Sequence, residues 1–311
     1  RYVYSRICLE DKRGMICAGL YSVGLSFALA AGKQLHTVEN FAVGNVRLWI
    51  QMLIMAVFFF GPVLYVFQRL AKKAEDGTKT AVCDKKSFFL TWLVIFLCWI
   101  PVFLAFYPGA FVYDAQDEYV QVATRVFSTH HPLTHVLLLG GAVCFGNKFL
   151  GSYNAGIAVY TLFQMFVLSG IFAYTISYLR RQLSKGICTG ITLFYGLFPV
   201  IPMYAVCSAK DTLFNAAFLL MLVQMVKLLE NTKSKYADVA LFILSSAAMM
   251  LFRNNGKMAY LVLLAGVIIW ALVQWKKERF WMRLAVMMLA SFVLYTGVDK
   301  ALAFVTHAEK G

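Results

Sequence analysis

The stretch YPGAFVYDAQDEY, residues 107–119, carries three carboxylates in a chain that is otherwise strongly apolar. It is followed by the His-Pro turn THHPL at residues 129–133, and long apolar runs lie on both sides. A carboxylate in hydrocarbon is costly unless it meets water, a cation or a polar partner. The stretch therefore predicts that the chain leaves an apolar environment here, in a loop between membrane-spanning segments.

The composition around this stretch is that of a multi-pass membrane protein. Apolar residues make up 61% of the chain and charged residues 14%, whereas a soluble domain carries about 25% charged residues. The net charge of +14 does not indicate nucleic-acid binding, because the basic residues lie in short clusters between apolar runs. The seven cysteines lie mostly inside apolar runs, so we expect no disulfide framework. Because the chain begins at Arg1 rather than Met, we interpret it as a fragment or a processed chain.

Apolar runs of roughly 20 residues, the length that crosses a bilayer, predict an all-α, polytopic helical bundle. They lie at residues 14–35, 48–68, 87–106, 154–179, 186–206, 211–229, 237–252, 258–274 and 281–305. The run 133–146 is shorter and rich in glycine, so it favours a re-entrant or interfacial helix over a span. The sequence therefore predicts about nine spans plus outer-face juxtamembrane helices.

The distribution of Lys and Arg supports this topology. Most of the 29 basic residues fall on one face if the run 133–146 does not cross, and the bias disappears if it does. By the positive-inside rule we predict a multi-pass protein of the cell membrane with a cytoplasmic N-terminus and a large outer loop at 107–153. The basic stretch 69–86 is the predicted linker between two leading spans, in residues 1–86, and a second module at 87–311.

The three carboxylates share one stripe if residues 113–127 form a helix. Asp114, Asp117 and Glu118 then lie at positions i, i+3 and i+4, and the opposite stripe is apolar and suited to a membrane surface. Like charges at this spacing repel by roughly tenths of a kcal/mol, which a cation or a basic partner would relieve. One carboxylate with a raised pKa could act as a base. The alternative is a solvated amphipathic helix in a loop.

His130 and His131 precede Pro132, which favours the first turn of a helix and predicts that the next helix begins there. Two adjacent histidines cannot both face one metal ion from a helix, and no third ligand stands at metal-site spacing. We therefore expect no structural zinc site at this turn.

Two further polar clusters fall on the same predicted outer face, at residues 208–211 and 253–257. Lys210 stands at a helix start and is a candidate phosphate-binding cation; the alternative is a short turn with a pair between Lys210 and Asp211. Arg253 and Lys257 are cations that break the positive-inside pattern. They suit a phosphate or pyrophosphate site, or else they snorkel to lipid headgroups.

Together these motifs resemble the GT-C superfamily of membrane glycosyltransferases. The resemblance covers about residues 87–260 and is carried by Tyr107-Pro-Gly, Asp114, Gln121, His131-Pro132, Lys210-Asp211 and Arg253-Asn-Asn-Gly256. It is similar to the branch of protein mannosyltransferases and aminoarabinose transferases, and most similar to a bacterial branch of uncharacterised multi-pass proteins. The chain departs from the family pattern where Leu133 replaces a second proline and where the acidic motif is Asp-x-x-Asp-Glu instead of a compact pair.

The resemblance implies transfer of a sugar from a polyprenyl-phosphate-linked donor to a glycan, lipid or protein acceptor at the extracytoplasmic face, in the cell envelope. A loop carboxylate would deprotonate the acceptor hydroxyl or hold a divalent cation such as Mg²⁺ or Mn²⁺. The catalytic candidates are Asp114, Asp117 and Glu118. The substrate-binding candidates are His130, His131, Lys210, Asp211, Arg253, Asn254 and Lys257.

Two other functions remain open from the sequence. A transporter or flippase of an anionic lipid-linked saccharide would need charged groups near mid-membrane and paired, broken spans, and this chain has few of either. A noncatalytic assembly or anchoring subunit is the third interpretation.

Overall fold

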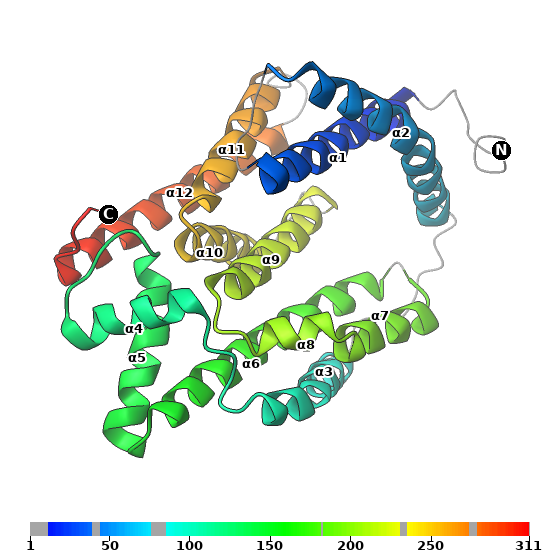
Figure 1. The fold of residues 1–311 in the computed structure, drawn as a ribbon. Coiled ribbons are helices and arrows are strands. Elements are labelled where there is room, and N and C mark those ends of the chain that lie inside the picture. Colours follow the sequence, from blue (N-terminus) through cyan, green and yellow to red (C-terminus); the bar gives the residue numbers. More distant parts are fainter. Residues whose placement is uncertain are drawn as a thin grey trace. The chain divides into compact units, whose positions relative to one another are not determined.

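The computed structural model describes residues 12–38, 44–75, 85–181, 183–230, 235–273 and 279–310. In these ranges the chain forms twelve α-helices and two isolated β-bridges (Figure 1). The helices are α1 (Lys12–Val38), α2 (Val46–Glu75), α3 (Lys85–Ala105), α4 (Tyr113–Thr124), α5 (Leu133–Leu150), α6 (Tyr153–Leu179), α7 (Lys185–Leu197), α8 (Val200–Ala205), α9 (Lys210–Glu230), α10 (Tyr236–Phe252), α11 (Gly256–Val273) and α12 (Arg279–Thr306). The predicted all-α architecture is confirmed.

The chain divides into two compact units, Arg1–Thr80 and Ala81–Gly311. In the first unit α1 packs against α2 through aromatic pairs, with the rings of Tyr21 and Phe67 5.9 Å apart. The division falls inside the predicted linker 69–86. Its first part continues α2 to Glu75, and residues 76–84 lie outside the described residues.

Eight helices in the described part are long and apolar enough to cross a membrane: α1, α2, α3, α5, α6, α9, α11 and α12. They expose many large apolar side chains, such as Val262 (75% exposed) and Phe304 (79% exposed). Surfaces of this kind are stable against lipid and are avoided in water. The chain is therefore a polytopic helical membrane protein.

The predicted span 186–206 was wrong as a single helix. The chain forms two short helices instead, α7 with 13 residues and α8 with 6. The break lies at Phe198, whose ψ is 115°, directly before Pro199. Proline clashes with an α-helical conformation of the residue before it and removes a backbone donor. Neither piece reaches spanning length, and α10, with 17 residues, falls just below it.

The run 133–146 extends further than predicted, because α5 continues to Leu150 and reaches 18 residues. That length and composition suffice to cross a membrane. In the structure α5 lies across α6 at a steep angle instead of alongside it (Figure 1). His135 on α5 contacts Tyr160 on α6, and Gly146 on α5 contacts Gly156 on α6. A long part of α5 therefore meets a short part of α6. Whether α5 crosses the bilayer stays a prediction.

Two glycines allow this crossing. A Cβ atom added to Gly146 would lie 2.1 Å from the backbone nitrogen of Gly156, and one added to Gly156 would lie 2.6 Å from the carbonyl oxygen of Ala142. The backbones of α5 and α6 therefore touch, and no side chain fits between them. On the other side of α5, a Cβ at Gly140 would meet Val122 of α4 at 2.6 Å.

We expect Gly146→Ala to destabilise the protein by about 1–3 kcal/mol, because the added methyl group forces the two backbones apart. The control is Gly141→Ala, since a Cβ atom added at that position would meet nothing within 4 Å. This control is expected to be neutral or stabilising by up to about 1 kcal/mol, because alanine favours the helix. Thermal unfolding of the purified protein in detergent measures both. Equal melting temperatures for the two variants would contradict the close approach.

Several loops meet at one end of the second unit. The segment after α3 pairs with the segment before α9, where the Ala110 nitrogen donates to the Val206 carbonyl at 2.9 Å. Asn254, between α10 and α11, donates to the His130 carbonyl before α5 at 3.1 Å. The residue Glu309 after α12 bridges to Ser128. We call this end of the second unit the site end. The loops before α4, α5, α9 and α11 lie there, and the predicted functional residues lie in or next to these loops.

Candidate functional site

A rigid backbone turn fixes the entrance to α4. The backbone nitrogen and the hydroxyl of Ser208 both donate to the Ala110 carbonyl at 3.0 Å. Gly109 has φ +131°, and a Cβ there would lie 2.3 Å from the Thr161 hydroxyl oxygen. Only glycine tolerates this conformation and this proximity. The turn therefore positions the start of α4 against the start of α9.

The centre of the site is a contact between α4, α9 and the turn before α5. The Lys210 ammonium donates to Asp114 Oδ2 at 2.6 Å and to His131 Nδ1 at 3.1 Å. The side chain of Asp114 is 47% exposed and that of Lys210 is 20% exposed. The site thus joins a water-accessible carboxylate to a half-buried cation, as predicted from their shared face.

Lys210 does not pair with its neighbour Asp211, as it would in a short turn, but with Asp114. Asp211 instead pairs with Arg253, whose guanidinium also lies 5.6 Å from the centre of the Phe214 ring. Two neighbouring residues at the start of α9 therefore pair with different partners: Lys210 with Asp114 on α4, and Asp211 with Arg253 at the end of α10. The Arg253 side chain is partly exposed, and its guanidinium bonds Asp211.

The electrostatics of the centre keep one group charged and the other neutral. The hydrogen bond from Lys210 lowers the pKa of Asp114, although partial burial opposes it. Burial and then the positive charge of Lys210 lower the pKa of His131. At neutral pH Asp114 is ionised and His131 is uncharged, so His131 Nδ1 accepts a hydrogen bond from the ammonium.

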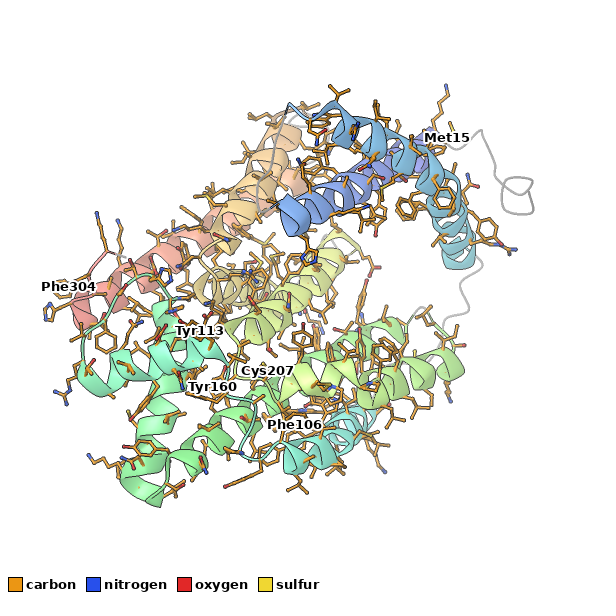
Figure 2. The ribbon with its side chains drawn as sticks, in the orientation of Figure 1. Met15, Phe106, Tyr113, Tyr160, Cys207 and Phe304 are labelled. Atoms are coloured by element: carbon orange, nitrogen blue, oxygen red, sulfur yellow. The ribbon has the colours of Figure 1, made fainter. Side chains whose placement is uncertain are left out.

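Behind this centre lies a buried chain of polar side chains. Glu118, which is 1% exposed, bonds His135 Nδ1, and His135 Nε2 lies 2.7 Å from the Tyr160 hydroxyl. The Tyr160 hydroxyl donates to Gln164 Oε1 at 2.9 Å. The Gln164 amide then donates to the carbonyl of Cys207 at 2.8 Å, three residues before Lys210. Figure 2 labels two residues of this chain, Tyr160 and Cys207. The chain connects α4, α5 and α6 to the start of α9.

This burial corrects the prediction of one acidic stripe. Glu118 is buried and Asp114 is partly exposed beside Lys210, whereas Asp117 is exposed. α4 also ends earlier than the predicted 127, because Arg125 adopts a left-handed conformation with φ 59°. The rotation of α4 is set by its packing, in which Ala115 and Glu118 are buried. Of the three catalytic candidates, Asp114 therefore lies at the centre, Glu118 lies inside the protein, and Asp117 lies on the surface.

The remaining candidates lie around the centre with different roles. His130 is exposed and its ring lies 4.8 Å from that of His131. Asn254 ties the α10–α11 turn to the carbonyls of Thr129 and His130, at 3.2 and 3.1 Å. Lys257 is partly buried on the first turn of α11. The structure therefore brings Asp114, His131 and Lys210 into direct contact and leaves Asp117 and His130 facing outward.

His135, Tyr160 and Gln164 were not singled out from the sequence. Each interrupts an otherwise apolar helix, with His135 in α5 and the other two in α6. Polar and ionisable side chains inside apolar spans usually have partners and a function. That signal would have identified the buried chain.

Comparison with protein families finds a match within the second unit. The model of a family of unknown function, DUF6020, matches residues 121–307, which is more than half of the chain. The chain belongs to this family. The matched segment contains His131, Lys210 and Arg253 and begins after Asp114 and Glu118. No curated protein and no solved structure matches the chain.

The DUF6020 chain offers a poor donor set for a divalent cation at this centre. Mg²⁺ and related hard cations need several oxygen ligands. Around Asp114 the structure places an ammonium and an imidazole instead. Within the described ranges no three His, Cys, Asp or Glu side chains are grouped closely enough to hold a metal ion. The groups in contact at this centre are one carboxylate, one ammonium and one imidazole.

Proposed function

We propose that this protein is a GT-C type membrane glycosyltransferase that transfers a sugar from a polyprenyl-phosphate-linked donor to an acceptor at the extracytoplasmic face. The observation that carries the proposal is the contact of Asp114 with Lys210 at 2.6 Å. It places an ionised, water-accessible carboxylate beside a cation at the start of an apolar helix. Sugar transfer from a lipid phosphate requires both groups, one for the acceptor and one for the leaving phosphate.

Asp114 is the proposed base. The acceptor hydroxyl gives its proton to the carboxylate while its oxygen forms a bond to the anomeric carbon of the sugar. The bond between that carbon and the phosphate oxygen breaks, and polyprenyl phosphate leaves with the bonding electrons. Asp114 has the exposure needed to meet an acceptor from water, whereas Glu118 is buried and bonded to His135.

Lys210 is the proposed phosphate partner. A lysine stabilises developing negative charge on the leaving phosphate, and the N-terminus of α9 adds a favourable dipole. A bound phosphate competes with Asp114 for the ammonium. Because the hydrogen bond from Lys210 is the main cause of the lowered pKa of Asp114, its loss raises that pKa and makes the carboxylate a stronger base. Donor binding thereby prepares the base for the acceptor.

The test is sugar transfer by the purified chain in liposomes that contain a panel of radiolabelled polyprenyl-phosphate sugars. We expect release of polyprenyl phosphate and a labelled acceptor product with at least one donor. If the labelled lipid moves between leaflets without loss of its sugar, the protein is a transporter of lipid-linked saccharides and the proposal is wrong. The absence of both transfer and movement would support a noncatalytic subunit.

The proposed topology places the site end outside and α5 on or within the outer leaflet. We expect a cysteine at Asn147, which is exposed on α5, to react with an impermeant thiol reagent added from outside the cell. The control is a cysteine at Lys185, which is exposed at the start of α7 and is expected to react only from the cytoplasmic side. The seven native cysteines are first replaced. Labelling of position 147 only from the cytoplasm would show that α5 crosses the membrane, and the predicted position of α5 on or within the outer leaflet would be wrong.

A further inference from the structure

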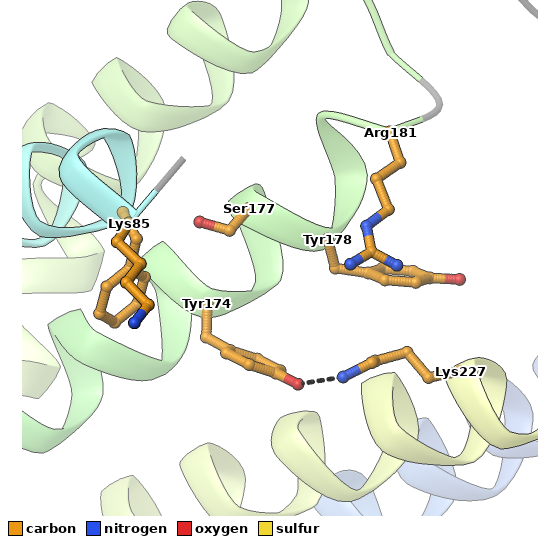
Figure 3. A pocket seen from close by; sticks show the side chains of 7 residues that line it. Lys85, Tyr174, Ser177, Tyr178, Arg181 and Lys227 are labelled. Atoms are coloured by element: carbon orange, nitrogen blue, oxygen red, sulfur yellow. Dashed lines mark hydrogen bonds between the residues drawn. The ribbon is translucent and has the colours of Figure 1, made fainter. Parts of the chain in front are cut away.

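A cavity lined by basic and aromatic residues lies at the opposite end of the same unit, far from Asp114. It has a volume of about 300 Å³ and is formed by the start of α3, the end of α6 and the end of α9 (Figure 3). Lys227, which lines it, is separated from Lys210 by about 25 Å along α9, at about 1.5 Å per residue. The cavity is therefore separate from the proposed site of sugar transfer.

The lining is strongly basic. Lys85, Arg181 and Lys227 come from three different elements, and Figure 3 shows their side chains around one space. Among the described residues that line the cavity there is no carboxylate. Lys227 is partly neutralised from outside the lining, because it donates to Asp238 and, at 2.6 Å, to the Tyr174 hydroxyl. The balance of charge still favours an anion.

A buried hydroxyl in the wall has no partner within the described residues. Ser177 is 8% exposed, and its Oγ makes no hydrogen bond there. A buried hydroxyl that lacks a hydrogen bond destabilises the protein. A ligand in the cavity that accepts a hydrogen bond from this hydroxyl would remove that cost. Ser177 lines the cavity together with Tyr174, also on α6, and Arg181, which follows α6. The wall thus offers hydroxyl donors and cations together.

We propose that this cavity binds a phosphoryl group. Arginine grips phosphate oxygens in a bidentate manner, lysine adds a compact positive charge, and hydroxyl donors fill the remaining acceptor positions. Carboxylates are smaller and leave such a set of donors incompletely used. The volume matches small-molecule sites, which begin at about 300 Å³.

Two sources supply this chemistry: the phosphate of an anionic lipid headgroup and free inorganic phosphate. The cavity is lined by the first residue of α3 and by residues in the last turns of two apolar helices, which is the depth of lipid headgroups. Aromatic side chains, Phe88 among them, also line it and suit the glycerol and first methylenes of a lipid. These features favour the lipid source, and the experiment separates the two.

The experiment is a titration of the full chain in uncharged detergent, followed by native mass spectrometry. The probes are phosphatidic acid, phosphatidylcholine and inorganic phosphate. We expect phosphatidic acid to bind, and we expect the double variant Lys85→Gln, Arg181→Gln to lose at least about tenfold in affinity, because two charge-assisted contacts disappear. The matched control is Lys185→Gln, which removes an exposed positive charge from the same end but outside the cavity and is expected to bind like the wild type.

A charge-retaining variant keeps the test valid if the double glutamine variant unfolds. Lys85→Arg with Arg181→Lys preserves both charges and is expected to retain most of the binding. Variant-sensitive binding of inorganic phosphate alone would support the phosphoryl site with free phosphate as its source. Equal affinity of the wild type and the double glutamine variant for every probe, or equal losses in Lys185→Gln, would overturn the proposal. Sugar-transfer activity plays no part in this readout, so the outcome is independent of the proposed function.

Discussion

We expect replacement of Asp114 by Asn to lower the proposed sugar transfer by a factor of about 10² to 10⁴, the usual cost of losing a general base. The amide keeps the shape of the side chain and loses both the negative charge and the ability to accept a proton. Lys210 loses its ionic partner at 2.6 Å but keeps His131. The measurement is the rate of labelled sugar transfer in liposomes under saturating donor.

This variant is expected to fold normally. The Asp114 side chain is 47% exposed, and ion pairs at such sites contribute about 0–1 kcal/mol to stability. Its melting temperature in detergent should therefore stay close to that of the wild type. A large fall in melting temperature would instead assign Asp114 a structural role.

Asp117→Asn is the matched control, because it makes the same chemical change one turn along the same helix. Asp117 is exposed, and the structure shows Lys210 bonded to Asp114 instead, so transfer should remain near the wild-type rate. Loss of activity in the Asp117 variant, with full activity in the Asp114 variant, would move the base to Asp117. Full activity in both would count against the enzyme itself.

Replacement of Glu118 by Leu is expected to destabilise the protein by about 1–3 kcal/mol, the cost of leaving a buried polar group without its hydrogen-bond partner. Glu118 and His135 are 1% and 0% exposed, so water cannot replace the lost contact. The imidazole is left with the Tyr160 hydroxyl alone, and the chain that ties α4 to α5 and α6 is cut at its first member. Thermal or denaturant unfolding in detergent measures the effect.

Glu118→Gln keeps a side chain of the same length that can hydrogen-bond to His135 Nδ1. We therefore expect a smaller loss of stability than in the leucine variant. Asp117→Leu controls for the addition of a leucine to α4, and it is expected to leave the melting temperature nearly unchanged because position 117 is exposed. A Glu118→Leu variant as stable as the wild type would show that the buried chain does not hold the helices together.

The membrane class and most of the helices could be predicted from the sequence, because apolar runs and basic clusters are local signals. The grouping of Asp114, Lys210 and Arg253 at one end also followed from sequence, since alternating spans bring every second loop to the same face. The break in the span 186–206 carried a local signal as well, in Pro199 and Pro202. Its effect on the helix was underestimated.

Only the tertiary structure decided which charges meet. Spacing places Asp114, Asp117 and Glu118 on neighbouring positions of a helix, but the rotation of α4 about its axis depends on how Val122 packs against Gly140 of α5. That packing turns Glu118 inward to His135 and Asp117 outward to solvent. The choice of Asp114 over Asp211 by Lys210 likewise depends on the turn at Gly109, which brings α4 to α9. Sequence periodicity is a property of one helix, whereas the partner of a side chain is set by the close approach of two, and glycine contacts far apart in the chain determine that approach.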